Sequence, residues 1–152
     1  MTRSKAIHVT AIAVLALAGA LGSVQVFGDD DRPYTEGSVW AISMIRVKPG
    51  MQDVYLRELL PLRKKIDEEA KKQGLIVSSH IFSGPATGRD DFDIMFLDEY
   101  RNWAAFDGLE AKYNAIEKKL VGPEDKQVQL MTRRGEVREI LGDKFMQELI
   151  PK

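Results

Sequence analysis

His80 is the residue of this sequence best suited to acid–base chemistry or to heme ligation. The chain has one other histidine, His8, near its amino terminus, and it has no cysteine. Alternation along residues 75–83 places His80 on the same strand face as Ser78 and Phe82. A serine triad built on Ser78 is disfavoured because no G-x-S-x-G elbow occurs. His80 is therefore the candidate catalytic residue, and the alternative is an inert, hydrogen-bonded histidine in a sheet.

Aromatic side chains are frequent enough to line a small-molecule pocket between a sheet and its helices. The candidate ligand-binding residues are Trp40, Arg46, Phe82 and Trp103, with Arg46 placed to hold an acidic group. The alternative is that these aromatic residues only pack a core. The full set of aromatic and apolar residues proposed to line this pocket is Trp40, Met44, Phe82, Phe96, Tyr100, Trp103 and Phe106.

Metal and phosphate sites have little support in the sequence. Zinc or copper would need mainly carboxylate ligands, and the densest acidic cluster, Asp90, Asp91 and Asp93, lacks the spacing of a calcium loop. Gly84 and Gly88 are not followed by the G-K-[ST] of a phosphate-binding loop. We predict no metal and no cofactor, and we interpret residues 84–91 as a polar hairpin loop.

The first residues of the 152-residue chain have the pattern of a secretory signal. Arg3 and Lys5 precede an uncharged run over residues 11–22, which is shorter than the roughly 20 residues that span a bilayer. We predict a cleaved signal peptide over residues 1–28, an N-terminal arm over 29–37 and one domain over 38–150. The protein is then periplasmic or secreted, without stable membrane association after cleavage; an uncleaved anchor is the alternative.

Charge in the remaining chain is balanced. Removing Arg3 and Lys5 leaves 20 basic against 23 acidic residues, a net charge of −3, with the signs interspersed. This pattern argues against a nucleic-acid partner and against a polybasic membrane-binding surface. Since no disulfide is possible, stability must come from the core and from any subunit interface.

A strand over residues 39–48 is the clearest element, and it ends at Pro49-Gly50. Alternation puts Val39, Ala41, Ser43, Ile45 and Val47 on one face and Trp40, Ile42, Met44, Arg46 and Lys48 on the other. Both faces are mostly apolar, which predicts a strand covered on both sides. A helix follows over residues 51–73, and Pro61 is expected to kink or break it.

The rest of the chain predicts a hairpin and further helices. Strands over residues 75–83 and 92–99 should pair antiparallel, and Asn102 should cap a helix whose apolar stripe includes Tyr113 and Ile116. Another helix should run from about Pro123 to about Arg134. Residues 136–150 allow a helix to Leu141 followed by a last strand over 144–150, which we favour, or a hairpin turning at Gly142.

This order of elements predicts an α+β fold. The elements follow one another as strand, helix, strand, strand, helix and strand. This is the βαββαβ pattern of ferredoxin-like domains, in which helices cover one face of an antiparallel sheet. The apolar second face of the first strand would then be exposed. Burial against a second copy is the simplest remedy, so we predict a homodimer.

The chain resembles the dimeric α+β barrel superfamily over residues 31–150. The resemblance rests on the VKPG that closes the first strand, the central hairpin, and Trp103 and Phe106 after it. This superfamily includes antibiotic-biosynthesis-type monooxygenases, heme-degrading monooxygenases and stress-responsive barrel proteins; DRPYTEG and REILGDKFMQEL are similar to uncharacterised exported bacterial members. The Asn, Trp and His of the heme-degrading enzymes cannot be matched here by motif. The resemblance therefore implies a fold and a dimer, without site residues.

Three functional hypotheses follow. The first is an exported homodimeric domain that binds a small apolar or aromatic ligand. The second is an enzyme resembling the cofactor-independent monooxygenases, in which a shaped pocket and a few polar groups suffice. The third is a structural or interaction module without a ligand. A cavity that touches His80 or Arg46 would favour the first two.

Overall fold

A computed structural model describes residues 31–152, and the predicted signal peptide over residues 1–28 lies outside the described residues. Residues 33–152 form one compact unit. Its elements are β1 (Tyr34–Val47), α1 (Gln52–Lys72), β2 (Ser78–Ser83), β3 (Ile94–Tyr100), the short 3-10 helix η2 (Trp103–Phe106), α2 (Leu109–Leu120), α3 (Glu124–Val137) and β4 (Arg138–Pro151).

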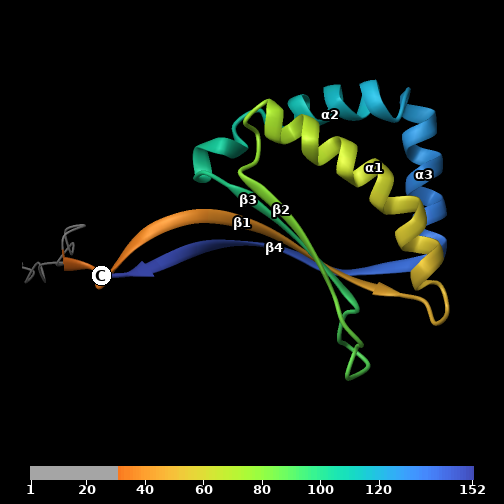
Figure 1. Cartoon of the computed structure of the whole chain (residues 1–152), viewed down its shortest axis with the longest axis horizontal. Helices are drawn as coiled ribbons and strands as arrows, with labels where there is room; N and C mark the ends of the chain where they lie inside the picture. The colour runs from red at the N-terminus through yellow and green to blue at the C-terminus, as the bar shows by residue number, and fades with distance from the viewer. Residues whose placement is uncertain (1–30) are drawn as a thin grey trace, which may run out of the picture. The chain divides into compact units, whose positions relative to one another are not determined.

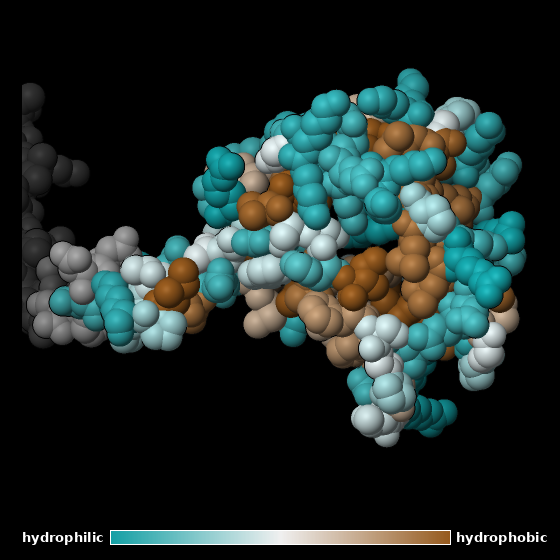
Figure 2. Space-filling model, viewed as in Figure 1, coloured by the Kyte–Doolittle hydropathy of each residue, from teal (hydrophilic) through white to brown (hydrophobic). Residues whose placement is uncertain are grey.

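The four strands form one antiparallel sheet with the order β2-β3-β1-β4. The helices lie on one side of this sheet (Figure 1). Their outer surface is mainly hydrophilic, whereas hydrophobic residues gather between the helices and the strands (Figure 2). The prediction of an α+β fold with an antiparallel sheet is thus confirmed.

Strand β1 has the two predicted faces. Val39, Ile45 and Val47 are buried beneath the helices, and they alternate with residues on the other face. We call the opposite side of the sheet the open face, because the described part of the chain places no helix on it. By register, its central apolar residues are Trp40, Ile42, Met44, Phe82, Met95, Leu97 and Met146.

The core lies between the helices and the covered face of the sheet. One cluster includes Val39, Ala70 and Ile116, and the other includes Ile45, Tyr55 and Ile94. Because α1 contributes Tyr55 to one cluster and Ala70 to the other, it anchors both halves of the core. Burial of these side chains is the main stabilising contribution in a chain without cysteine.

Helix α1 continues through Pro61, so of the two predicted effects, a kink or a break, the break does not occur. The exposed ring lies on the solvent side, while Leu59 is buried on the core side. Core contacts on both sides of Pro61 therefore hold the helix together although one backbone hydrogen bond is missing.

Replacing this proline should stabilise the protein. We expect Pro61→Ala to raise the free energy of unfolding by about 1 kcal/mol, because the missing bond is restored. Urea unfolding measures the change, with Lys64→Ala, one turn further on, as a control expected within about 0.5 kcal/mol of the parent. A less stable Pro61→Ala protein would mean that the helix needs its proline geometry to pack.

The second strand starts later than predicted, and the second helix is divided. Residues 75–77 precede β2, although Leu75 and Ile76 are buried in the core as apolar residues. After β3, Asn102 precedes only η2 and makes no side-chain cap. Helix α2 starts after Gly108, whose φ of 64° interrupts a continuous helix at that point.

The last strand is longer than predicted at both ends. It begins at Arg138, directly after α3, so a helix to Leu141 and a hairpin at Gly142 were both wrong. Pairing with β1 over nearly its full length draws residues 138–143 into the sheet. Tyr34 pairs with Pro151, so residues 34–37 belong to β1 and not to a separate arm.

Candidate functional site

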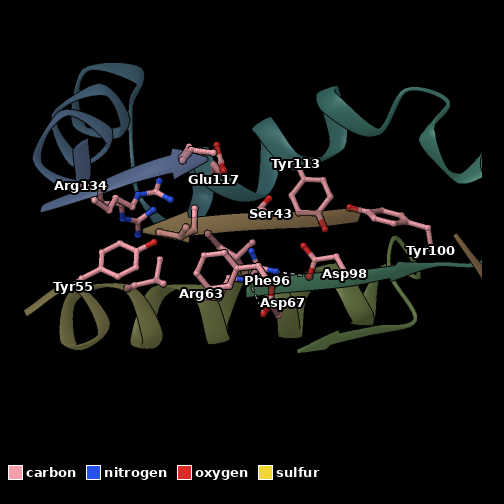
Figure 3. Close-up of a pocket in the computed structure, with 15 residues that line it drawn as sticks. Ser43, Tyr55, Arg63, Asp67, Phe96, Asp98, Tyr100, Tyr113, Glu117 and Arg134 are labelled. Carbon is pink, nitrogen blue, oxygen red and sulfur yellow. Dashed lines mark hydrogen bonds and ion pairs between the residues drawn. The ribbon is translucent and has the colours of Figure 1, made fainter. Parts of the chain in front are cut away.

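A cavity of about 280 Å³ lies between the covered face of the sheet and the helices. Figure 3 shows side chains from both layers that point toward it. Its walls mix apolar, aromatic and charged groups from α1, α2, α3, β1, β3 and β4. The lining residues are Ser43, Ile45, Tyr55, Leu59, Arg63, Ile66, Asp67, Phe96, Asp98, Tyr100, Tyr113, Glu117, Arg134, Arg138 and Ile140.

Arg63 organises one wall of the cavity. Its guanidinium forms ion pairs with Asp67, at 2.8 Å one turn along α1, and with Asp98 on β3. Ser79 accepts a hydrogen bond from Arg63 at 3.1 Å and donates one to Asp67 at 2.9 Å. Burial alone would lower the pKa of Arg63, but the two carboxylates more than offset it and raise the pKa. One guanidinium therefore pairs with both carboxylates, and the group keeps a net negative charge.

Two tyrosines lie beside this ion-pair group. Tyr100 and Tyr113 point their hydroxyls toward one another, near Asp98 (Figure 3). Burial raises the pKa of both hydroxyls, and Asp98 adds to the effect. They therefore stay protonated near neutral pH and can both donate and accept hydrogen bonds.

Tyr55, Arg134 and Arg138 form a cationic end of the cavity. Tyr55 is only 1% exposed, and its hydroxyl points toward the Arg134 guanidinium (Figure 3). Within the described residues, neither the Tyr55 hydroxyl nor the Nε of Arg134 makes a well-formed hydrogen bond, although Arg138 approaches the Tyr55 hydroxyl closely enough to act against the rise of its pKa. The Arg138 Cζ lies 5.4 Å from the centroid of the Tyr55 ring.

Burial changes the pKa of both unpartnered groups. It raises the pKa of Tyr55, against the opposing charges of Arg138 and Arg134. It lowers the pKa of Arg134, against the opposing effects of Tyr55 and Glu117. Arginine nevertheless remains charged in proteins at neutral pH. This end of the cavity therefore presents two guanidinium groups and a neutral phenol.

Three of the residues predicted from the sequence meet on the open face instead. The ring of His80 lies 6.2 Å from that of Trp40 and 6.2 Å from that of Phe82, measured between centroids. Both His80 and Phe82 are exposed. A shallow hollow of about 310 Å³ beside Trp40 is lined by Ile42, Leu97, Met146, Gln147 and Glu148 as well.

Arg46 and Trp103 lie elsewhere. Arg46 donates hydrogen bonds to the backbone carbonyls of Gly88, at 3.0 Å, and Asp91, so it holds the β2–β3 loop. Trp103 is 53% exposed on η2, where its ring lies 6.4 Å from that of Phe145. Neither residue lines the interior cavity, and neither does His80. The five candidates therefore do not form one site.

The acidic residues Asp91 and Asp93 make hydrogen bonds that stabilise the β2–β3 loop and its junction with β1. The Asp91 carboxylate accepts hydrogen bonds from the backbone and the hydroxyl of Thr87, and Asp93 accepts one from the backbone of Val47 at 2.8 Å. Backbone donation from Thr87 lowers the pKa of Asp91. Over the described residues, no group of three or more His, Asp or Glu side chains is arranged to hold a metal ion.

Sequence reasoning missed most of the cavity residues. Arg63 and Asp67 stand beside the apolar stripe of α1, and Ser43 and Asp98 occupy positions that face the helices. A polar residue on an inward-facing position is a usable signal, since such a group needs a partner or a ligand. Ser43 was placed on the correct face but was not considered as a site residue.

One carboxylate on the open face gives a pH-dependent prediction. Ser38 and Ser78 each donate a hydrogen bond of 2.6 Å to Glu99, and these bonds lower the pKa of its carboxyl. The ionised form therefore stabilises the fold above its unfolded pKa of about 4.3, and the contribution is lost as pH falls through the lower folded value.

We expect Glu99→Gln to weaken this dependence. Between about pH 5 and about pH 3, the free energy of unfolding should fall less steeply in the variant than in the parent, as measured by urea unfolding at each pH. Equal slopes in the two proteins would show that the hydrogen bonds to Glu99 contribute nothing to folding.

Comparisons with known proteins do not show a family for this chain. The chain matches no protein-family model, and it matches no curated protein. Among residues 31–152, no helix is both long enough and apolar enough to cross a membrane.

Proposed function

We propose that this protein is a homodimeric, ferredoxin-like domain that binds a small molecule in the cavity beneath its helices. One observation carries the proposal: the sheet has two different faces. The helix-covered face borders a cavity with unpartnered polar groups, and the other face is apolar and bare in the described part of the chain. Each face supports one part of the function.

The open face supports the dimer. Its apolar residues come from all four strands, and Phe82 and Met146 are 55% and 47% exposed. An apolar surface of this kind, although His80, Glu99 and Lys144 also lie on it, is unfavourable in water and is typical of an interface. A two-fold dimer brings the same patch of two copies together, which gives the closed α+β barrel that the sequence resemblance implies. The second copy is therefore the proposed partner.

The cavity supports the binding function. Its volume of about 280 Å³ is at the small end of ligand pockets, which usually measure roughly 300–1,000 Å³. Phe96, Leu59 and Ile66 supply apolar contact, and the charged groups supply orientation. The proposed ligand is therefore small and partly aromatic, as the sequence suggested, but it carries polar groups.

The proposal also includes export of the protein from the cytoplasm. The basic residues Arg3 and Lys5 and the uncharged run of residues 11–22 support a cleaved signal over residues 1–28 and a periplasmic or secreted location. An exported ligand-binding protein would meet small molecules from outside the cytoplasm.

Native mass spectrometry of the protein purified from its own host tests the binding function. We expect the parent to retain a small molecule that Ser43→Leu lacks, because the larger side chain enters the cavity from β1. Ser83→Leu, the same change at an exposed strand position, should retain the molecule. A ligand-free parent, or equal retention in all three proteins, would count against the cavity as the binding site.

A further inference from the structure

The strongest unexplained feature of the cavity is a pair of buried polar atoms without a hydrogen-bond partner. The Tyr55 hydroxyl and the Arg134 Nε belong to different helices, and Figure 3 shows the two side chains at the same end of the cavity. A buried donor without a partner costs stability, and native proteins rarely keep two of them side by side. The feature is explained if a ligand supplies the missing acceptor.

The charges around these donors identify the acceptor as an anion. The side chains that face the cavity with charge are Arg63 and Asp67 from α1, Asp98 from β3, Glu117 from α2, Arg134 from α3 and Arg138 from β4. Arg63 is ion-paired with both Asp67 and Asp98, and this group carries a net negative charge. This leaves two guanidinium groups against the single carboxylate of Glu117, so this end of the cavity has an excess of positive charge.

A carboxylate fits the remaining donors. It accepts hydrogen bonds through two oxygens, and guanidinium groups bind it with charge-assisted bonds. One oxygen can accept from the Tyr55 hydroxyl and the other from Arg134, while Arg138 contributes its charge from β4. An apolar ligand would leave both donors unsatisfied.

The other end of the cavity has a different character. Tyr100, Tyr113 and Asp98 present hydroxyls and a carboxylate there, which together accept a hydrogen bond from a ligand hydroxyl. Between the two ends, Phe96, Leu59 and Ile66 provide an apolar wall for a ring. The small volume limits the ligand to about one ring.

We infer that the ligand is a single-ring hydroxy-aromatic acid, with its carboxylate held by Tyr55 and Arg134 and its hydroxyl at the Tyr100–Tyr113 end. This inference rests on the proposed binding function and adds the chemical class of the ligand. Arg134 and Arg138 discriminate the acid from a neutral analogue by its charge, and the Tyr55 hydroxyl donates a hydrogen bond to the carboxylate.

Isothermal titration calorimetry with three probes tests the inference on the full protein after any retained molecule has been removed by exhaustive dialysis. 4-Hydroxybenzoate should bind at least tenfold more tightly than 4-hydroxybenzamide, which lacks the charge, and more tightly than benzoate, which lacks the hydroxyl. Tyr55→Phe should weaken 4-hydroxybenzoate about ten- to hundredfold and weaken 4-hydroxybenzamide less, because the amide carbonyl accepts the same hydrogen bond without a charge. Tyr34→Phe, outside the cavity on β1, is the matched control and should bind as the parent does.

Thermal unfolding gives a second readout. Without ligand, Tyr55→Phe should melt no lower than the parent, because the ring is kept and an unsatisfied hydroxyl is removed. A lower melting temperature would show that the hydroxyl makes a structural bond, and it would overturn the inference.

The binding outcomes separate the inference from the proposed function. Equal affinity for the acid and the amide, or no effect of Tyr55→Phe, overturns the carboxylate assignment and leaves a ligand cavity in place. If no probe binds but the purified protein retains another molecule, only the ligand class is wrong. If no probe binds and nothing is retained, both the inference and the proposed function are wrong.

Discussion

Ile42→Glu is expected to convert the proposed dimer into a monomer. Ile42 lies at the centre of the open face, opposite Leu97 on β3 and Lys144 on β4. In a two-fold dimer each copy contributes one glutamate, so two carboxylates would be buried close together, and the cross-strand Lys144 offsets only part of the cost. Such charges cost several kcal/mol, and association should weaken by at least about a thousandfold.

Sedimentation velocity at micromolar concentration measures this change. The monomer itself should remain folded, because the described chain already leaves Ile42 on an uncovered surface; far-UV circular dichroism checks this. Met131→Glu makes the same kind of substitution at a 67% exposed position on α3 and should remain dimeric. A dimer that persists in Ile42→Glu would show that the subunits meet through another surface.

Arg63→Met is expected to lower the free energy of unfolding by about 3 kcal/mol. The side chains of Arg63, Asp67 and Asp98 are only 21%, 15% and 18% exposed. Removing the arginine leaves two neighbouring carboxylates partly buried without a counter-ion, which is more costly than the loss of an exposed pair. Arg133→Met is the control: it breaks the pair with Glu58, but Arg133 is 66% exposed, so we expect a loss below about 1 kcal/mol.

The pH dependence of Arg63→Met tests the cause. Without the arginine, protonation of the two carboxylates removes their uncompensated charge, so the variant should recover stability relative to the parent as pH falls toward about 4. Asp98→Asn in the Arg63→Met background should recover part of the loss at neutral pH. A deficit that is independent of pH would point to lost packing against Phe96, over which Arg63 lies.

The sequence predicted those parts of the fold that depend on local pattern. Alternation alone separated Val39 and Ile45 from Trp40 and Ile42, and the structure places them on opposite faces. The end of β1 and the start of α1 were also predictable, since Pro49-Gly50 interrupts both patterns. The hairpin of β2 and β3 followed from its turn residues.

The errors have one physical cause. Residues 138–143 have no strong local preference, and pairing with β1 determines that they are a strand. Core contacts likewise keep α1 whole at Pro61. Long-range packing decides such segments, and one sequence does not reveal it.

The cavity was harder to predict for the same reason. Tyr55, Asp98 and Arg134 belong to three elements, and nothing in their spacing shows that they converge. Tyr113 was assigned to an apolar stripe, which is correct for its ring but omits its hydroxyl. His80 and Arg46 were prominent because of their chemistry, yet they lie outside this cavity.

A crystal structure of the protein as purified from its host tests the central claim most directly, because it examines both faces of the sheet at once. We predict a two-fold dimer in which the open faces pack together through Trp40, Ile42 and Leu97. We also predict a small acid in the cavity, within hydrogen-bond distance of the Tyr55 hydroxyl and Arg134. A monomer with a solvent-exposed open face, and a cavity filled by its own side chains, would contradict the account.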